Sequence, residues 1–303
     1  MMFTGLSAFP LTPLTDDSVD EAAFTALVQR LPAAGVDSIT AVGSTGSYAY
    51  LSAAERARVI RLAVEHAGQT PVFAGIGALR TSQVLAQAEA AQSAGAQALL
   101  LAPVSYQPLT DDDVFELFRT VTAEVSAPVI VYDNPGTTRF TFSTQLYARI
   151  AQLPRIASIK IPPPSTDPDA ARARIQEVRD AVPAGVSIGV SGDAAAATGL
   201  LAGADAWYSV IGGTLPDPTV AITRAAQRGE TEQALALSEH LAPLWSLFGE
   251  FGSLRVTAAV AEQLGLAPKN CLPLPILGLD DDARARVAEA LKLIEQNQNE
   301  QVV

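Results

Sequence analysis

The sequence is poor in cysteine and histidine. Its single cysteine, Cys271, excludes an internal disulfide and is typical of a protein from the reducing cytosol. The two histidines, His66 and His240, lie far apart and no Cys/His/Asp group has metal-ligand spacing, so we expect no metal and no cofactor. Residues 1–9 carry no basic segment, and no apolar run reaches the length of a membrane span. We therefore predict a cytoplasmic protein without a signal peptide.

Positive charge is also scarce. The 20 Lys and Arg residues are outnumbered by 32 Asp and Glu, which gives a net charge of −12. Such a surface argues against nucleic acids and anionic membranes as partners, because both select basic surfaces. The hydrophobic content of 49% is ample for a large core. These properties favour a globular protein that acts on small molecules.

Short apolar runs alternate with segments of helical periodicity about eight times along the chain. Most runs are continuous rather than alternating, which is typical of parallel strands buried on both faces. Eight strand–helix units predict an α/β fold, a (β/α)8 TIM barrel over residues 1–228, with a packed C-terminal helical extension over 229–303. The predicted strands are Phe3–Phe9, Val36–Val42, Val72–Gly75, Ala98–Ala102, Val129–Tyr132, Ile156–Ile161, Val186–Val190 and Trp207–Ile211. Predicted helices include Asp20–Leu31, Ala53–His66, Ser82–Ser93, Asp111–Glu124 and Ala170–Ala181, and in the extension Thr231–Leu247, Ser253–Leu264 and Asp281–Gln296.

Lysine is the rarest of the charged residues, and one of the three is misplaced for a surface charge. Lys269 and Lys292 lie in polar surroundings, whereas Lys160 ends the apolar run that begins at Ile156. Burying an ammonium is costly, and lysine, unlike arginine, can lose its proton and become an amine nucleophile. A lysine whose ammonium reaches solvent is the alternative. Because active sites of βα barrels lie at the carboxyl ends of the strands, we favour the nucleophile.

Other strand ends supply possible helpers for Lys160. Ser44 and Thr45 stand in a glycine-framed loop that could hold a carboxylate, although hydroxyls that merely cap a turn are the alternative. Tyr132 could relay a proton, and Tyr106 could do the same; either could instead be a core aromatic. A lysine, a tyrosine and a hydroxyl pair are what a Schiff-base lyase acting on a 2-oxo acid requires. We take Thr45 as a catalytic as well as a substrate-binding residue, and Tyr208, in the last predicted strand, as a further substrate-binding residue.

The chain resembles the family of dihydrodipicolinate synthase and N-acetylneuraminate lyase, which are class I, pyruvate-dependent aldolases on a (β/α)8 barrel. The resemblance runs from about Phe3 to beyond Pro216. It implies that Lys160 forms the imine, that Tyr132 relays protons and that Ser44 and Thr45 bind the carboxylate. It also implies a homo-oligomer, a homotetramer or homodimer. The matching segments are Gly43-Ser44-Thr45-Gly46, Ala74-Gly75-Ile76-Gly77, Tyr132-Asp133-Asn134-Pro135, Ile159-Lys160, Ser191-Gly192-Asp193 and Gly203-Ala204-Asp205-Ala206.

Several positions depart from the family pattern. Where the synthases carry an arginine that binds the carboxylate of the aldehyde substrate, this chain has Thr137, and Arg139 is two residues away. The tyrosine that the family donates across a subunit interface is matched by Ser105, with Tyr106 next to it. Trp207 and Tyr208 stand where smaller residues are common, and we expect them to narrow the pocket or line it with aromatic rings.

These departures lead to one preferred function and two alternatives. We predict a Schiff-base lyase or aldolase that makes or breaks a C–C bond between pyruvate, or a related 2-oxo acid, and an aldehyde other than the synthase's semialdehyde. The first alternative is a true 4-hydroxy-tetrahydrodipicolinate synthase of lysine biosynthesis, in which Arg139 reaches into the site. The second is a barrel that binds a 2-oxo acid without turnover.

Overall fold

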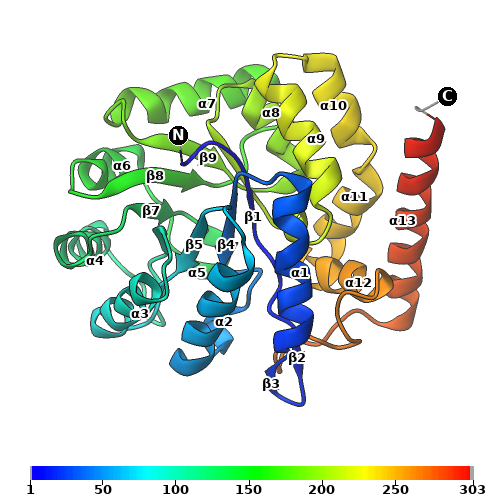
Figure 1. The fold of residues 1–303 in the computed structure, drawn as a ribbon. Coiled ribbons are helices and arrows are strands. Elements are labelled where there is room, and N and C mark those ends of the chain that lie inside the picture. Colours follow the sequence, from blue (N-terminus) through cyan, green and yellow to red (C-terminus); the bar gives the residue numbers. More distant parts are fainter. Residues whose placement is uncertain (1, 301–303) are drawn as a thin grey trace.

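Eight parallel strands close into a barrel in the computed structural model, which describes residues 2–300 (Figure 1). Neighbours follow the order β1-β10-β9-β8-β7-β6-β5-β4, and β1 pairs with both β4 and β10 to complete the ring. The predicted (β/α)8 barrel is thereby confirmed. The strands are β1 (Gly5–Ala8), β4 (Ser38–Ala41), β5 (Val72–Gly75), β6 (Ala98–Leu101), β7 (Val129–Tyr132), β8 (Ile156–Ile161), β9 (Ser187–Val190) and β10 (Ala206–Ser209).

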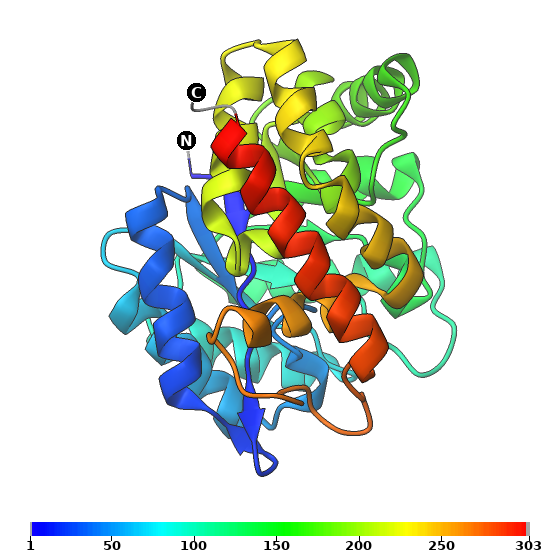
Figure 2. The ribbon, with the colours of Figure 1, turned by 90° about the vertical axis from the view of Figure 1, so that its right-hand side faces the viewer.

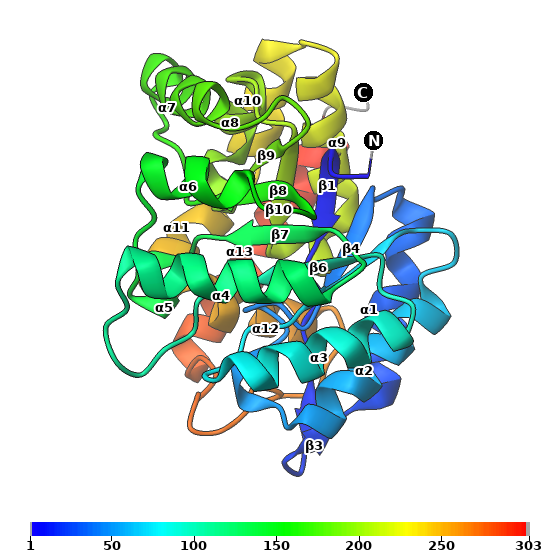
Figure 3. The same cartoon turned by 90° about the vertical axis from the view of Figure 1, so that its left-hand side faces the viewer.

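Helices surround the barrel and cover the outer face of its strands, while side chains of the strands themselves fill the interior (Figure 3). Ser52 and Glu55 form the predicted capping box, and the glycines at 35, 95 and 203 have the positive φ expected after helix ends. A small hairpin that the sequence did not predict follows β1; it consists of β2 (Leu14–Thr15) and β3 (Ser18–Val19). The helices are α1 (Glu21–Ala34), α2 (Ala53–His66), α3 (Thr81–Ser93), α4 (Asp111–Glu124), α5 (Pro135–Thr138), α6 (Thr144–Ala151), α7 (Pro168–Ala181), α8 (Ala196–Leu201) and α9 (Pro216–Gln227). Short 3-10 turns are η1 (Tyr48–Tyr50), η2 (Asp193–Ala195) and η3 (Ile211–Gly213).

Over residues 229–300 the extension contains four helices rather than the three that we predicted. The segment 231–247 divides into α10 (Thr231–Glu239) and α11 (Ala242–Phe251), because Pro243 lacks an N–H and is accommodated in the first turn of a new helix. α12 (Ser253–Gln263) and α13 (Asp281–Glu300) agree with the prediction, and α13 lies across the outside of the molecule (Figure 2). The predicted boundary at 228/229 falls in the turn between α9 and α10, and the two-part division stays a prediction. Within residues 2–300, no helix is both long and apolar enough to cross a membrane.

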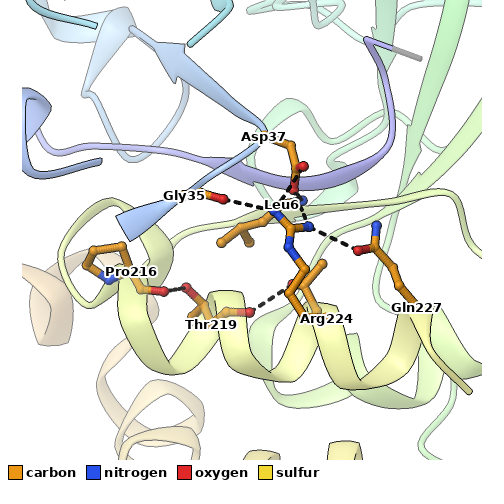
Figure 4. A network of polar contacts seen from close by, with 8 residues as sticks. Leu6, Gly35, Asp37, Pro216, Thr219, Arg224 and Gln227 are labelled. Atoms are coloured by element: carbon orange, nitrogen blue, oxygen red, sulfur yellow. Dashed lines mark hydrogen bonds and ion pairs between the residues drawn. The ribbon is translucent and has the colours of Figure 1, made fainter. Parts of the chain in front are cut away.

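One charged network ties α9 to the first strands of the barrel (Figure 4). The Asp37 carboxylate, just before β4, accepts hydrogen bonds from the Leu6 amide at 2.7 Å and from the Arg224 guanidinium at 2.8 and 3.0 Å. Arg224 also donates to the Gly35 carbonyl at 2.8 Å and to the Gln227 side chain at 3.0 Å. Because these contacts join α9, β1 and β4 at the amino ends of the strands, we expect them to stabilise barrel closure without touching the catalytic end.

Replacing Arg224 with alanine should lower the free energy of unfolding by about 1–2 kcal/mol, because the half-buried Asp37 carboxylate loses its charge-assisted hydrogen bonds with the half-buried guanidinium. The matched control is Arg58→Ala, which removes the more exposed pair with Glu21 and should change the free energy of unfolding much less. Urea denaturation measures both. Equal losses for the two variants would show that the Asp37–Arg224 network has no special role in closure.

Candidate active site

Lys160 lies inside the barrel and not at its surface. It is opposite Tyr132 of β7 and Gly189 of β9 in the strand register, and only 2% of it is exposed. Its Nζ lies 4.0 Å from the ring centre of Phe9, 4.2 Å from that of Tyr132 and 5.7 Å from that of Tyr208. The alternative of a solvent-exposed ammonium is therefore wrong for this lysine: its amine is surrounded by aromatic rings at the carboxyl end of β8.

Burial makes the Lys160 ammonium easier to deprotonate, so that more of it is present as the neutral amine. Desolvation lowers its pKa from the usual 10.5 to about 7, and the negative charge of Asp193 opposes that shift. Roughly half of the amine is then neutral near pH 7, whereas an exposed lysine is almost wholly protonated. A neutral amine is the form that attacks a carbonyl.

Asp193 is a buried carboxylate held in place by three hydrogen bonds. It accepts hydrogen bonds from Trp207 Nε1 at 3.0 Å and from the amides of Val210 at 3.1 Å and Ile211 at 2.7 Å. This corrects our expectation for Trp207, which does not narrow the pocket. Neighbouring residues of a strand point to opposite faces, so Tyr208 points into the barrel while Trp207 packs in the core outside it.

Tyr208 forms part of the wall around Lys160. Its hydroxyl and the Ser158 hydroxyl are 2.7 Å apart, and both residues are buried. Space for the ring depends on Gly189 of the neighbouring strand, because a Cβ at that position would lie 2.2 Å from the Tyr208 ring. The Tyr208 hydroxyl is thus paired with Ser158, which precedes Lys160 by two residues on β8. Tyr208 therefore presents its ring, and not its hydroxyl, to the lysine amine.

Tyr132 carries the hydroxyl best placed to move a proton near Lys160. Its oxygen lies 3.2 Å from Ser44 Oγ and accepts a hydrogen bond from Asn134 Nδ2 at 2.8 Å. Burial raises the Tyr132 pKa, while the hydrogen bonds with Ser44 and Asn134 act in the opposite direction. The structure therefore brings together three residues that the sequence placed far apart: Lys160, Tyr132 and Ser44.

The loop after β4 offers free hydrogen-bond donors beside this tyrosine. Bonds from the Ser47 amide to the Ser44 carbonyl and from the Tyr48 amide to the Gly43 carbonyl shape the loop. Within residues 2–300, the amides of residues 44–46 and the hydroxyl of Thr45 find no acceptor, although Thr45 is only 3% exposed. Amide and hydroxyl donors that have no protein acceptor can be satisfied by a ligand, and an anion such as a carboxylate satisfies several at once.

Three predicted residues lie at the rim and not beside the lysine. Thr137 and Arg139 are exposed, and Arg139 ends α5 with φ at 57°. The Tyr106 side chain is 90% exposed and does not take part in the hydrogen bonds of Tyr132. Within the described chain these residues do not complete the site around Lys160, and their roles stay predictions.

Sequence reasoning missed several residues that shape the site. Phe9, the last residue of the first predicted strand, faces Lys160, and Asn134 binds the Tyr132 hydroxyl. Asp133 is buried, accepts a hydrogen bond from Tyr147, and has its pKa raised by burial to about 6. The alternation of inward and outward side chains along each barrel strand would have placed Phe9 inside the barrel, on the same side as Lys160. No sequence signal distinguishes the side-chain direction of Asn134.

A closed (β/α)8 barrel with a buried amine at the carboxyl end of a strand defines a barrel enzyme of the Schiff-base lyase class. The model of the Dihydrodipicolinate synthetase family matches residues 2–294. This chain belongs to that family, whose members are class I lyases, and the resemblance seen in the sequence is confirmed. The alternative of a barrel that binds a 2-oxo acid without turnover finds no support, because the curated relatives of this chain are named as enzymes.

Curated relatives and solved structures agree over nearly the whole chain. A 4-hydroxy-tetrahydrodipicolinate synthase of Hyphomonas neptunium is 33% identical over 96% of this chain and 98% of its own. The crystal structure of a dihydrodipicolinate synthase from Agrobacterium tumefaciens is 46% identical, with a TM-score of 0.93, and covers 97% of this chain and 98% of its own. An Acinetobacter baumannii dihydrodipicolinate synthase complexed with pyruvate is 28% identical, with a TM-score of 0.88 over 97% and 99% of the two chains.

Proposed function

We propose that Lys160 forms a Schiff base with pyruvate or a closely related 2-oxo acid, and that the resulting enamine makes or breaks a C–C bond with an aldehyde. The observation that carries the proposal is the Lys160 amine, 2% exposed and within 4.2 Å of the Tyr132 ring centre, beside a loop of unpaired donors. The pyruvate complex of the Acinetobacter baumannii relative supports the choice of 2-oxo acid.

The chemistry begins with the neutral amine. Lys160 Nζ attacks the ketone carbon, and one proton moves from the nitrogen to the former ketone oxygen. Tyr132 gives its proton to the same oxygen, which leaves as water, so that a protonated imine forms. Tyr132, now an oxyanion, takes a proton from the carbon next to the imine and produces an enamine. The enamine carbon adds to the aldehyde, and the new alkoxide takes the proton from Tyr132. Water then hydrolyses the protonated imine, which releases the product and the neutral amine and returns a proton to Tyr132.

The loop after β4 fixes the substrate during these steps. Its free amides and the Thr45 hydroxyl bind the carboxylate and turn the ketone toward Lys160. Ser44 belongs to the same loop, and its Oγ, 3.2 Å from the Tyr132 oxygen, can pass a proton between Tyr132 and the substrate. The aromatic rings of Phe9 and Tyr208 exclude water from the amine.

Aldehyde-dependent consumption of pyruvate tests this function. We expect the protein to consume pyruvate only when an aldehyde is present, with glyceraldehyde as a neutral acceptor and succinic semialdehyde as a carboxylated one. A lack of consumption with a broad panel of aldehydes, in either direction of the reaction, would contradict an aldolase.

Replacing Thr45 with valine should raise the KM for pyruvate by roughly ten-fold and change kcat by less than about three-fold, because the hydroxyl contributes to binding in all states of the reaction. Steady-state kinetics measure both constants. Ser187→Ala removes a hydroxyl at the amino end of β9, away from the carboxyl ends of the strands, and it serves as the control with unchanged kinetics. A fall in kcat at unchanged KM would place Thr45 in the chemical step and not in carboxylate binding.

A second candidate is the synthase activity itself, favoured by relatives that carry that name and are 31–33% identical over 96% of this chain. That activity needs a cation for the carboxylate of the aldehyde, and the exposed Arg139 is the nearest arginine along the loop to Thr137. A Thr137→Arg variant tests it. If the chain is a synthase in which Arg139 binds the aldehyde's carboxylate, Arg139→Ala abolishes the use of carboxylated aldehydes. If it is not a synthase, the wild type shows no preference for carboxylated aldehydes, and Thr137→Arg creates one.

Assembly and location complete the proposal. We propose a homodimer or homotetramer in the cytoplasm, in which a neighbouring subunit covers the exposed Tyr106 side chain. Sedimentation of the wild type and of a Tyr106→Ala variant tests the assembly. A monomer at micromolar concentration would contradict it.

A further inference from the structure

The Asn134 side chain bonds to Tyr132 and not to the helix that follows it. Asn134 is the N-cap residue of α5, where an asparagine side chain commonly accepts a hydrogen bond from the first amides of the helix. Here it makes no capping bond, and its Nδ2 donates to the Tyr132 oxygen at 2.8 Å. The Asn134 carbonyl accepts from the amides of Thr137 and Thr138 and from Thr138 Oγ1, all at 3.0 Å, which holds the residue in place.

We propose that Asn134 is a positioning residue for the reaction, which directs the proton of Tyr132 toward Ser44 and the reacting atoms. The inference rests on the proposed role of Tyr132 as proton relay. An amide N–H can only donate, so the tyrosine oxygen must accept from Asn134. The phenolic proton is then left for Ser44 Oγ, 3.2 Å away, or for the bound substrate.

The same bond acts after the proton has left. The oxyanion of Tyr132 forms in a buried place where desolvation disfavours it and where the neighbouring Asp133 carboxylate adds repulsion. The Asn134 amide and Ser44 supply the stabilising hydrogen bonds. Both partners come from this chain, whereas the Tyr106 phenol is 90% exposed. The two hydrogen bonds that the structure gives the Tyr132 hydroxyl are thus supplied by its own chain.

Exchange of the methyl hydrogens of pyruvate in D2O, followed by NMR, reports on this relay without any aldehyde, because each enamine that forms loses one of those hydrogens. Asn134→Leu removes the donor at similar volume. We expect the exchange kcat to fall by about 10- to 100-fold, the KM for pyruvate to change by less than about three-fold, and the basic limb of the pH profile to move to higher pH. Asn134→Asp, the same size without a donor, should lose at least as much.

A double variant separates positioning from a general loss of structure. In a Tyr132→Phe background the bond is already gone, so adding Asn134→Leu should cost less than about two-fold. An equal loss in both backgrounds, or wild-type exchange by Asn134→Leu, would overturn the inference while leaving the proposed function intact. Absence of exchange and of a borohydride-trapped adduct in the wild type would instead remove the proposed function itself.

Discussion

Replacing Lys160 with methionine will abolish the lyase activity, with a loss of about four orders of magnitude or more, because no other side chain in the site can form an imine. Lys160→Arg is the matched variant: it keeps the charge and much of the length but has no amine to deprotonate. It should be as inactive as the methionine variant. Pyruvate exchange and aldol turnover measure the effect, and substantial residual activity in either variant would assign the chemistry to another group.

The methionine variant should also be more stable than the wild type, and the difference should depend on pH. Because the Lys160 pKa falls from 10.5 to about 7 on folding, the unfolded chain binds one more proton than the folded chain between those values. Wild-type stability therefore rises with pH across that interval. Removing the amine stabilises the fold most below pH 7, by about 5 kcal/mol at most, and this gain fades toward pH 10. A gain that does not vary with pH would contradict the buried, depressed amine.

Replacing Tyr132 with phenylalanine should lower kcat by roughly 10²- to 10³-fold and leave pyruvate binding nearly unchanged. The ring stays against Lys160, so the aromatic contact is preserved, and the hydroxyl that bonds with Ser44 and Asn134 is lost. Imine formation and enamine formation should both become slower, because both need proton transfer by the Tyr132 hydroxyl. Rapid-quench trapping with borohydride measures the first step and deuterium exchange the second.

The control for this variant is Tyr208→Phe, which removes a hydroxyl that lies 2.7 Å from Ser158 and not near the relay. It should change kcat by less than about five-fold, and its main effect should be on stability. If both phenylalanine variants lose activity equally, the account of Tyr132 as the proton carrier is wrong.

Much of the fold and the centre of the site could be predicted from the sequence for identifiable reasons. Parallel strands buried on both faces leave continuous apolar runs, so the eight barrel strands were found within a few residues at their ends. Lys160 was found because a charge at the end of such a run is costly. Tyr132, Ser44 and Thr45 were found because the carboxyl ends of barrel strands converge.

The features that the sequence did not reveal depend on side-chain direction and on small differences in free energy between alternative local contacts. Trp207 and Tyr208 are adjacent aromatics, and only the pleat decides that one faces Asp193 and the other Lys160. The break between α10 and α11 depends on Pro243, which a mainly helical pattern concealed. The turn of Asn134 toward Tyr132 instead of its own helix is a choice between two hydrogen bonds of similar strength, and pattern alone cannot decide it.

Trapping with borohydride and mapping the product tests the central claim most directly. Incubation with pyruvate and sodium borohydride should add one reduced pyruvate to the protein, and peptide mass spectrometry should place it on Lys160 alone. The rate of trapping should rise with pH through about 7, as the amine loses its proton. An adduct on Lys269 or Lys292, or none with pyruvate and its close 2-oxo acid relatives, would contradict Lys160 as the Schiff-base residue.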